Sequence, residues 1–273
     1  MTPSEAPHAR SPRRSRAAVY TAAAVAVLAV AGTATATAGT GDHTSAAGTK
    51  DDGTQAAVTQ KWGKPVGGDE FDGKAVDESK WTRYGDYPGH DGNGMRLKEK
   101  DTVGGGHLTV SGDKDGNTGG VAWKKGQTHG RWEARMRVQQ KDGGGNPYHP
   151  VLILWPDSDK WPDDGELDYA ESDAGSTKMQ AFLHYGNGSE NGGQDPYTYD
   201  QKLDTSKWHN YAVEWTGDHI AGYIDGKEWF KDTNPKAQPP GPMHQTIQLD
   251  DFFPEGNLNP ATMDVDWVRM YDV

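Results

Sequence analysis

Apolar and polar residues alternate with a period of two along much of the chain from about Trp62 onward. In Arg131–Val138, Trp, Ala, Met and Val fall on one face, and three Arg and one Glu fall on the other. This pattern is typical of a β-strand with one buried and one solvent-facing side. Tyr211–Trp215 alternates similarly, and Val265–Tyr271 supplies a closing strand. The alternation places three tryptophans in the core: Trp132, Trp215 and Trp267.

Two other segments predict a hairpin and a buried strand. Asp225-Gly226 separates Tyr223-Ile224 from Lys227–Phe230, and such a dipeptide between two strand-like runs predicts a tight two-residue turn. Val151–Leu154 is continuously apolar, which predicts a strand covered on both faces.

The composition favours an all-β chain. The 273 residues include 36 Gly, 16 Pro, 10 Trp and 11 Tyr, and no Cys, so disulfides and thiolate metal sites are excluded. Short strands separated by Gly, Asp, Asn and Pro clusters predict a β-sandwich of two packed antiparallel sheets. The roughly 210 residues after the N-terminal region fit one such domain, predicted here over 61–273.

The N-terminal region predicts export. Four Arg within residues 10–16 precede an uncharged Ala/Val/Leu-rich run over 17–31 and an alternating-Ala cleavage region. Because the apolar run is shorter than the roughly 20 residues that span a bilayer, we interpret 1–38 as a cleaved signal peptide of a secreted protein. An uncleaved membrane anchor is the alternative, and no stable membrane insertion is expected after cleavage. Residues 39–60, small and polar, predict a disordered linker.

The charge balance excludes one class of partner. The chain has 28 Lys+Arg and 40 Asp+Glu, a net charge of −12. Residues 1–38 hold four Arg and one Glu, so the remainder has 24 basic and 39 acidic residues, a net charge of −15. Nucleic-acid binding depends on clustered cations, so no nucleic-acid partner is expected.

Three carboxylates within six positions form the most informative motif. Glu166, Asp168 and Glu171 lie in a strand-like stretch, where Glu171 on a regular strand would face away from the other two. A β-bulge at Tyr169-Ala170 would bring all three to one face, and bulges are frequent beside active sites. Paired carboxylates suit retaining glycoside hydrolysis. A solvated acidic face and a calcium site are the alternatives.

The chain resembles glycoside hydrolase family 16, the laminarinase-like jelly-roll enzymes, in the branch whose active-site strand reads E-x-D-x-x-E. The resemblance rests on an ordered series of motifs that covers nearly the whole domain. These motifs are Asp69-Glu70-Phe71 with Trp81, His107–Val110, Gly130–Arg135, Leu154-Trp155-Pro156, the three acids, His184-Tyr185-Gly186, Trp208–Trp215, Tyr223–Gly226 and Val265–Tyr271.

The resemblance implies a concanavalin A-like jelly roll and a role for each acid. Glu166 would be the nucleophile, Asp168 an auxiliary acid and Glu171 the general acid/base of a retaining double displacement. No cofactor is implied for catalysis. The expected partner is a polysaccharide substrate, and we expect a monomer.

Four further residues are candidates for substrate binding. Trp155 and Trp161 would stack on sugar rings, and His184 resembles a histidine of the family's cleft. Core packing is the alternative for the tryptophans, and a structural role is the alternative for His184. Gln248, in a segment expected near the cleft, completes this set.

Metal binding has one candidate residue. Asp266 matches a position that can contribute to a structural calcium in the family, and oxygen ligands suit calcium. His149 and His209 show no zinc-ligand spacing.

The sequence departs from the usual family sequence at three places near the expected cleft. Tyr169-Ala170 replaces a bulky aliphatic pair, His149-Pro150-Val151 replaces Pro-Ala, and Gln245–Leu249 stands where many members read L-N. These departures leave the identity of the polysaccharide substrate undetermined. The acidic net charge, and the absence of an Arg/Lys cluster in the segments expected to form the cleft, favour a neutral β-1,3- or mixed-linkage β-glucan over sulfated galactans. A lectin-like binding protein that has lost activity and a transglycosylase are the alternatives.

Overall fold

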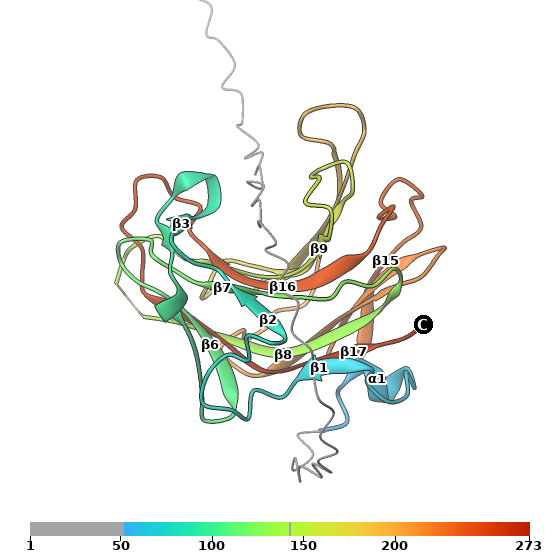
Figure 1. The fold of residues 1–273 in the computed structure, drawn as a ribbon, viewed down its shortest axis with the longest axis horizontal. Coiled ribbons are helices and arrows are strands. Elements are labelled where there is room, and N and C mark those ends of the chain that lie inside the picture. The colour runs from blue at the N-terminus through green and yellow to red at the C-terminus, as the bar shows by residue number, and fades with distance from the viewer. Residues whose placement is uncertain (1–51, 142) are drawn as a thin grey trace, which may run out of the picture.

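Two antiparallel sheets packed face to face make up the part of the chain that the computed structural model describes, residues 52–141 and 143–273 (Figure 1). The predicted all-β sandwich, a jelly roll, is therefore confirmed. The predicted signal peptide, 1–38, and the first part of the predicted linker lie outside the described residues. Among the described residues, no helix is long and apolar enough to cross a membrane.

The first sheet has eight strands, ordered β15-β14-β13-β8-β17-β6-β5, with β1 paired to β17. Their bounds are β1 Gly67–Asp69, β5 Asp101–Gly104, β6 His107–Gly112, β8 Gly130–Gln140, β13 His209–Trp215, β14 Ile220–Ile224, β15 Lys227–Asp232 and β17 Ala261–Tyr271.

The second sheet has seven strands, ordered β12-β11-β10-β9-β16-β7-β2. Their bounds are β2 Trp81–Arg83, β7 Gly120–Trp123, β9 His149–Pro156, β10 Glu166–Glu171, β11 Gln180–Tyr185, β12 Gly193–Thr198 and β16 Met243–Asp250. Smaller elements are the pair β3 Tyr87–Pro88 and β4 Met95–Arg96, the 3₁₀ turns His90–Gly92 and Lys98–Lys100, and the helix α1 Ala56–Thr59.

The main core lies between the two sheets and follows the predicted alternation. Strand β8 contributes Trp132, Ala134 and Met136, and β13 contributes Tyr211 and Trp215, all at most 1 % exposed. The rings of Trp132 and Trp215 stack with centroids 6.5 Å apart. Burying these large rings supplies much of the apolar stabilisation of the sandwich.

The third tryptophan assigned to the core is buried on a different face. The pairing of β17 with β8 shifts between Val265 and Trp267, which is a bulge. Because the bulge adds a residue, Trp267 leaves the face of Val265 and pairs opposite Arg135. Trp267 is fully buried, with the guanidinium carbon of Arg269 4.2 Å from its ring centroid. The alternation therefore predicted its burial correctly and its side of the sheet wrongly.

The predicted hairpin is confirmed at β14–β15. Ile224 pairs with Lys227, and the two residues between them, Asp225 and Gly226, have φ values of 48° and 72°. Positive φ at both turn positions matches the right-handed twist of a two-residue hairpin, and glycine adopts it without steric cost.

Helix α1 corrects two predictions at once. The backbone amides of Ala56 and Ala57 donate to the Glu133 carboxylate, at 2.5 and 3.1 Å, so Glu133 is fully buried instead of facing water. Trp62 packs with Tyr223 at 5.5 Å, in an apolar cluster on the outer face of the first sheet. The predicted disordered linker, 39–60, is therefore wrong for the residues of α1.

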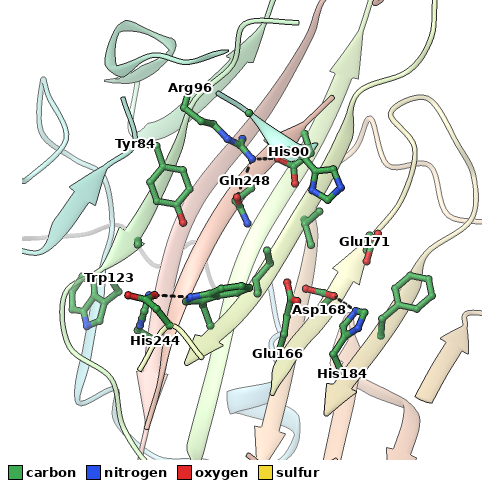
Figure 2. Close-up of a pocket in the computed structure, with 18 of the residues that line it drawn as sticks. Tyr84, His90, Arg96, Trp123, Glu166, Asp168, Glu171, His184, His244 and Gln248 are labelled. Carbon is green, nitrogen blue, oxygen red and sulfur yellow. Dashed lines mark hydrogen bonds and ion pairs between the residues drawn. The ribbon is translucent and has the colours of Figure 1, made fainter. Parts of the chain in front are cut away.

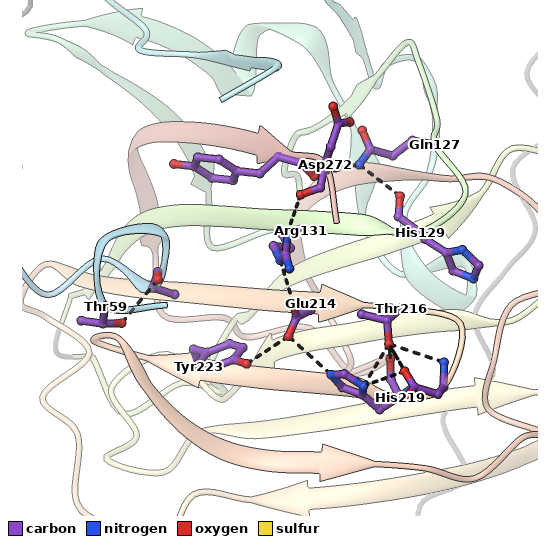
Figure 3. A network of polar contacts seen from close by, with 12 residues as sticks. Thr59, Gln127, His129, Arg131, Glu214, Thr216, His219, Tyr223 and Asp272 are labelled. Atoms are coloured by element: carbon purple, nitrogen blue, oxygen red, sulfur yellow. Dashed lines mark hydrogen bonds and ion pairs between the residues drawn. The ribbon is translucent and has the colours of Figure 1, made fainter. Parts of the chain in front are cut away.

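A polar network holds the same outer face together (Figure 3). Arg131 Nε donates to Glu214 Oε1 at 2.6 Å, and the second oxygen of Glu214 accepts from the Tyr223 hydroxyl at 3.3 Å. His219 lies 3.4 Å from that oxygen. Beside this network, the Thr59 hydroxyl donates to the carbonyl of Gly226, which ties α1 to the hairpin turn.

A chain that begins at Lys61 is expected to be less stable than one that begins at Asp51, by about 2–4 kcal/mol. The shorter chain leaves the buried carboxylate of Glu133 without its two amide donors and uncovers apolar surface. Urea unfolding of both chains measures the difference. Equal stabilities would contradict the structural role of α1.

Candidate active site

Strand β10 carries the predicted bulge. Asp168 pairs with Ile153 of β9 and Ala170 pairs with Leu152, so Tyr169 is the extra residue. The Tyr169 hydroxyl donates to Gln245 Oε1 at 2.6 Å in the core, which holds the bulged residue inward. The prediction of a bulge at Tyr169-Ala170 is confirmed.

The bulge brings the three acids to one wall of a cleft of about 1040 Å³ (Figure 2). Glu166, Asp168 and Glu171 all line this cleft, although each is at most 8 % exposed. The cleft lies on the outer face of the second sheet, away from α1. Val151 and Ile153 of β9 form part of its floor, while Leu152 points into the core. The apolar run of β9 thus meets the core on one face and the floor of the cleft on the other, and all four of its side chains are buried, as predicted.

Burial raises the pKa of both Glu166 and Asp168. Burial, with the neighbouring Asp168 charge, raises the pKa of Glu166 well above its usual range. Burial and the Glu171 charge raise the pKa of Asp168 in the same way. His184 Nε2 of β11 lies 3.2 Å from Asp168 Oδ2, so the predicted cleft histidine does border the acids.

The raised pKa of Glu166 predicts that Glu166→Gln stabilises the fold at neutral pH. A carboxyl whose pKa is higher in the folded state contributes its full stability below about pH 4, and that stability falls as pH rises through the raised pKa. Glutamine cannot ionise. At pH 7 we expect the Tm of the variant to exceed that of the wild type, by about 2–4 °C for each kcal/mol gained in the free energy of unfolding. Near pH 3 the two Tm values should become equal. A lower Tm at pH 7 would contradict this.

Glu171 is bound by a histidine that no sequence pattern identified. His149 Nε2 lies 2.5 Å from Glu171 Oε1, and His149 Nδ1 lies 3.1 Å from Asp173 Oδ1. The ring of Phe252 covers the imidazole, with centroids 4.2 Å apart. Burial alone lowers the pKa of His149, but the two carboxylates outweigh it and raise the pKa to about 9.

The other predicted substrate-binding residues divide into two groups. Trp155 and Gln248 line the cleft. The Trp155 indole N–H donates to Asp159 at 2.9 Å, and Gln248 Oε1 accepts from Arg96 at 3.0 Å. Trp161 packs against the cleft residue His184, with ring centroids 5.9 Å apart, and its role in sugar binding stays a prediction.

A buried arginine stands on the wall opposite the acids (Figure 2). Arg96 is 4 % exposed, lines the cleft and forms an ion pair with Asp250. It also donates to the backbone carbonyls of Gly119 and Leu249. No pattern in the sequence indicated a cation at this position. Asp250 balances the charge of Arg96, so the cleft gains no anion-binding cluster.

The residues around Asp266 do not fit the calcium ion that the family resemblance implied. Asp266 Oδ2 lies 2.7 Å from Arg135 Nη1, so a guanidinium already balances its charge. Among the His, Asp and Glu side chains of the described residues, the one group of three close enough together to hold a metal is Glu166, Asp168 and His184, which lies on the other sheet. Burial raises the pKa of the first two of these, which suits acid–base chemistry.

Comparisons with known proteins point to one family of enzymes. Residues 91–269 match the family model described as Glycosyl hydrolases family 16. A beta-glucanase from Rhodothermus marinus is 26 % identical over 253 residues, covering 76 % of this chain and 84 % of its own length. The glucan endo-1,3-beta-glucosidase A1 of Niallia circulans is 26 % identical over 170 residues, covering 52 % of this chain but only 24 % of its own length. The X-ray structure of the laminarinase from Rhodothermus marinus superposes with a TM-score of 0.61 at 25 % identity, covering 77 % of this chain and 97 % of that one.

Proposed function

The chain belongs to glycosyl hydrolases family 16, and on that premise we propose that it is a secreted, retaining endo-β-glycosidase that hydrolyses a β-1,3- or mixed-linkage β-glucan. The observation that carries the proposal is the bulged strand β10, which presents Glu166, Asp168 and Glu171 together in the cleft. The similarity to a beta-glucanase over 84 % of that relative's length supports the substrate class. The predicted signal peptide supports secretion.

The first step of the reaction uses two of the acids. The Glu166 carboxylate attacks the anomeric carbon, and Glu171 gives its proton to the glycosidic oxygen as the C–O bond breaks. The products are a covalent glycosyl ester on Glu166 and a free sugar hydroxyl. In this proposal Asp168 stays protonated while Glu166 is ionised, because burial and the Glu171 charge raise the pKa of Asp168, so only one negative charge occupies this buried pair.

The second step reverses the roles. Glu171, now a carboxylate, takes a proton from water as the water oxygen attacks the anomeric carbon, and the ester bond to Glu166 breaks. The product keeps the anomeric configuration of the substrate because it results from two inversions.

The charges of the cleft favour a neutral polymer. Six carboxylates line it, Asp157, Asp159, Glu166, Asp168, Glu171 and Asp250, against two permanent cations, Arg96 and Lys124. A sulfated chain would meet repulsion at low salt. The tryptophans Trp123 and Trp155 and the tyrosines Tyr84 and Tyr87 supply flat apolar surfaces for uncharged sugar rings.

Product release from a panel of polysaccharides tests the proposal. Residues 51–273, beside Glu166→Gln, are incubated with laminarin, lichenan, agarose, carrageenan, xyloglucan and chitin. We expect release of oligosaccharides from laminarin or lichenan by the wild type alone. Binding without release would favour the lectin-like alternative, and lengthened oligosaccharides would favour transglycosylation. Release only from a sulfated galactan would contradict the proposed substrate.

A further inference from the structure

The imidazole of His149 connects Glu171, which lines the cleft, to Asp173. His149 is the first residue of β9, and β9 pairs with β10, the strand that carries Glu171. Its two ring nitrogens face Glu171 at 2.5 Å and Asp173 at 3.1 Å. With Asp173 ionised and no proton on Oε1 of Glu171, both contacts are hydrogen bonds only when both ring nitrogens carry hydrogen. The geometry therefore selects the doubly protonated, positively charged ring.

Charged groups from several elements surround the imidazole of His149. Phe252 covers one face of the ring and separates it from His90, whose ring centroid lies 4.4 Å from that of Phe252. Asp250 of β16 is the register partner of His149 and is itself paired with Arg96. The titratable and charged groups around the ring are Glu171, Asp168, Asp173, Asp250, Arg96 and His90.

We propose that His149, held by Asp173, is a positioning residue for Glu171. It occupies Oε1 of Glu171, so the transferable proton sits on Oε2, and it stabilises the carboxylate that forms when this proton passes to the leaving oxygen. The His149 proton stays on Nε2 throughout. This inference rests on the proposed role of Glu171 as acid/base.

The arrangement has a benefit and a cost. A cation in contact with Glu171 makes it a stronger proton donor, which helps most when the leaving group is poor, as in a polysaccharide. The cost concerns the pH range of activity. Removal of this positive charge is expected to move the alkaline limb of the pH–rate profile to higher pH.

Kinetics of His149→Gln test the inference. On the glucan that the wild type cleaves, we expect kcat/KM below the alkaline limb to fall about 10-fold or more, and the limb to move up by about one pH unit or more. On 2,4-dinitrophenyl β-laminaribioside, whose leaving group needs no proton, kcat/KM should change less than about twofold. An unchanged pH profile and equal losses on both substrates would overturn the inference. A purely structural role would lower both rates equally and leave the limb in place.

Asp173→Asn provides a variant that preserves the imidazole and its packing. The Asp173 side chain is 58 % exposed, so the substitution should fold, and it should give a smaller shift of the limb in the same direction. In the His149→Gln background it should have no further effect, since Asp173 acts only through His149. Asp218→Asn is the matched control, because Asp218 is an exposed partner of His219 on the other sheet and should leave the profile unchanged.

Nitrogen-15 NMR of the histidine side chains gives a readout that needs no substrate. We expect His149 to be doubly protonated at pH 8 in the wild type, and to lose its proton at lower pH in Asp173→Asn. A neutral His149 at pH 8 would overturn the inference. A wild type without activity on any glucan would instead contradict the proposed function, and the NMR result would still show whether His149 is charged.

Discussion

Glu166→Gln is expected to lower kcat on the active glucan by roughly 10⁴-fold or more. The amide has the size of the carboxylate but no anionic oxygen that could form the glycosyl ester, and losing a nucleophile removes the reaction path instead of weakening it. The cleft around the substitution stays intact, so KM or the binding constant for oligosaccharides should change little. Reducing-sugar release measures kcat, and calorimetry with an oligosaccharide measures binding.

Two controls separate this loss from damage to the fold. The variant should melt at a higher temperature than the wild type at pH 7, because burial raises the pKa of the carboxyl that it removes. Proton NMR of the first wild-type product should show the β-anomer. Substantial activity in Glu166→Gln, or inversion of the anomeric centre, would contradict the proposed mechanism.

Glu171→Ala is expected to reduce cleavage of the polysaccharide by about 10²–10⁴-fold and to be rescued by azide on an activated substrate. With 2,4-dinitrophenyl β-laminaribioside, the first step needs no acid, and the glycosyl ester on Glu166 accumulates because no base activates water. Azide is a small anionic nucleophile that fits the space the carboxylate leaves. It should restore turnover and give a β-glycosyl azide, which carbon NMR identifies.

The matched variant is Glu166→Ala, which reverses the stereochemistry of the rescue. Without a nucleophile on the protein, azide attacks the substrate directly from the opposite face and gives the α-azide. The pair of products therefore assigns a role to each acid. An α-azide from Glu171→Ala would exchange the two proposed roles.

The local sequence pattern was sufficient to predict most of the strands and the bulge in β10. Alternation in β8, the Asp225-Gly226 turn and the spacing of the three acids each depend on neighbours within a few residues, where backbone geometry fixes which side chains share a face. The bulge in β17 was missed because Trp267 is apolar on either face. Nothing in its identity distinguishes the inner from the outer side of the sheet.

Contacts between distant segments explain the remaining errors. His149 meets Glu171 and Asp173, 22 and 24 residues away, without any motif spacing, and only its departure from the usual family residue marked the position. Arg96 reaches the cleft from a two-residue strand, 154 positions before Asp250. Glu133 was predicted to face water because the helix that covers it lies in a stretch of small and polar residues, whose composition is typical of a linker.

The position of α1 also determines how the protein can be attached to a support. The helix begins on the outer face of the first sheet, and the cleft opens on the outer face of the second, so the whole thickness of the sandwich separates them (Figure 1). A tag, carrier domain or bead joined ahead of residue 52 is therefore held behind the molecule. Immobilisation through this end leaves the cleft turned toward a polymer in solution or in a solid wall, whereas coupling through side chains of the second sheet would block it.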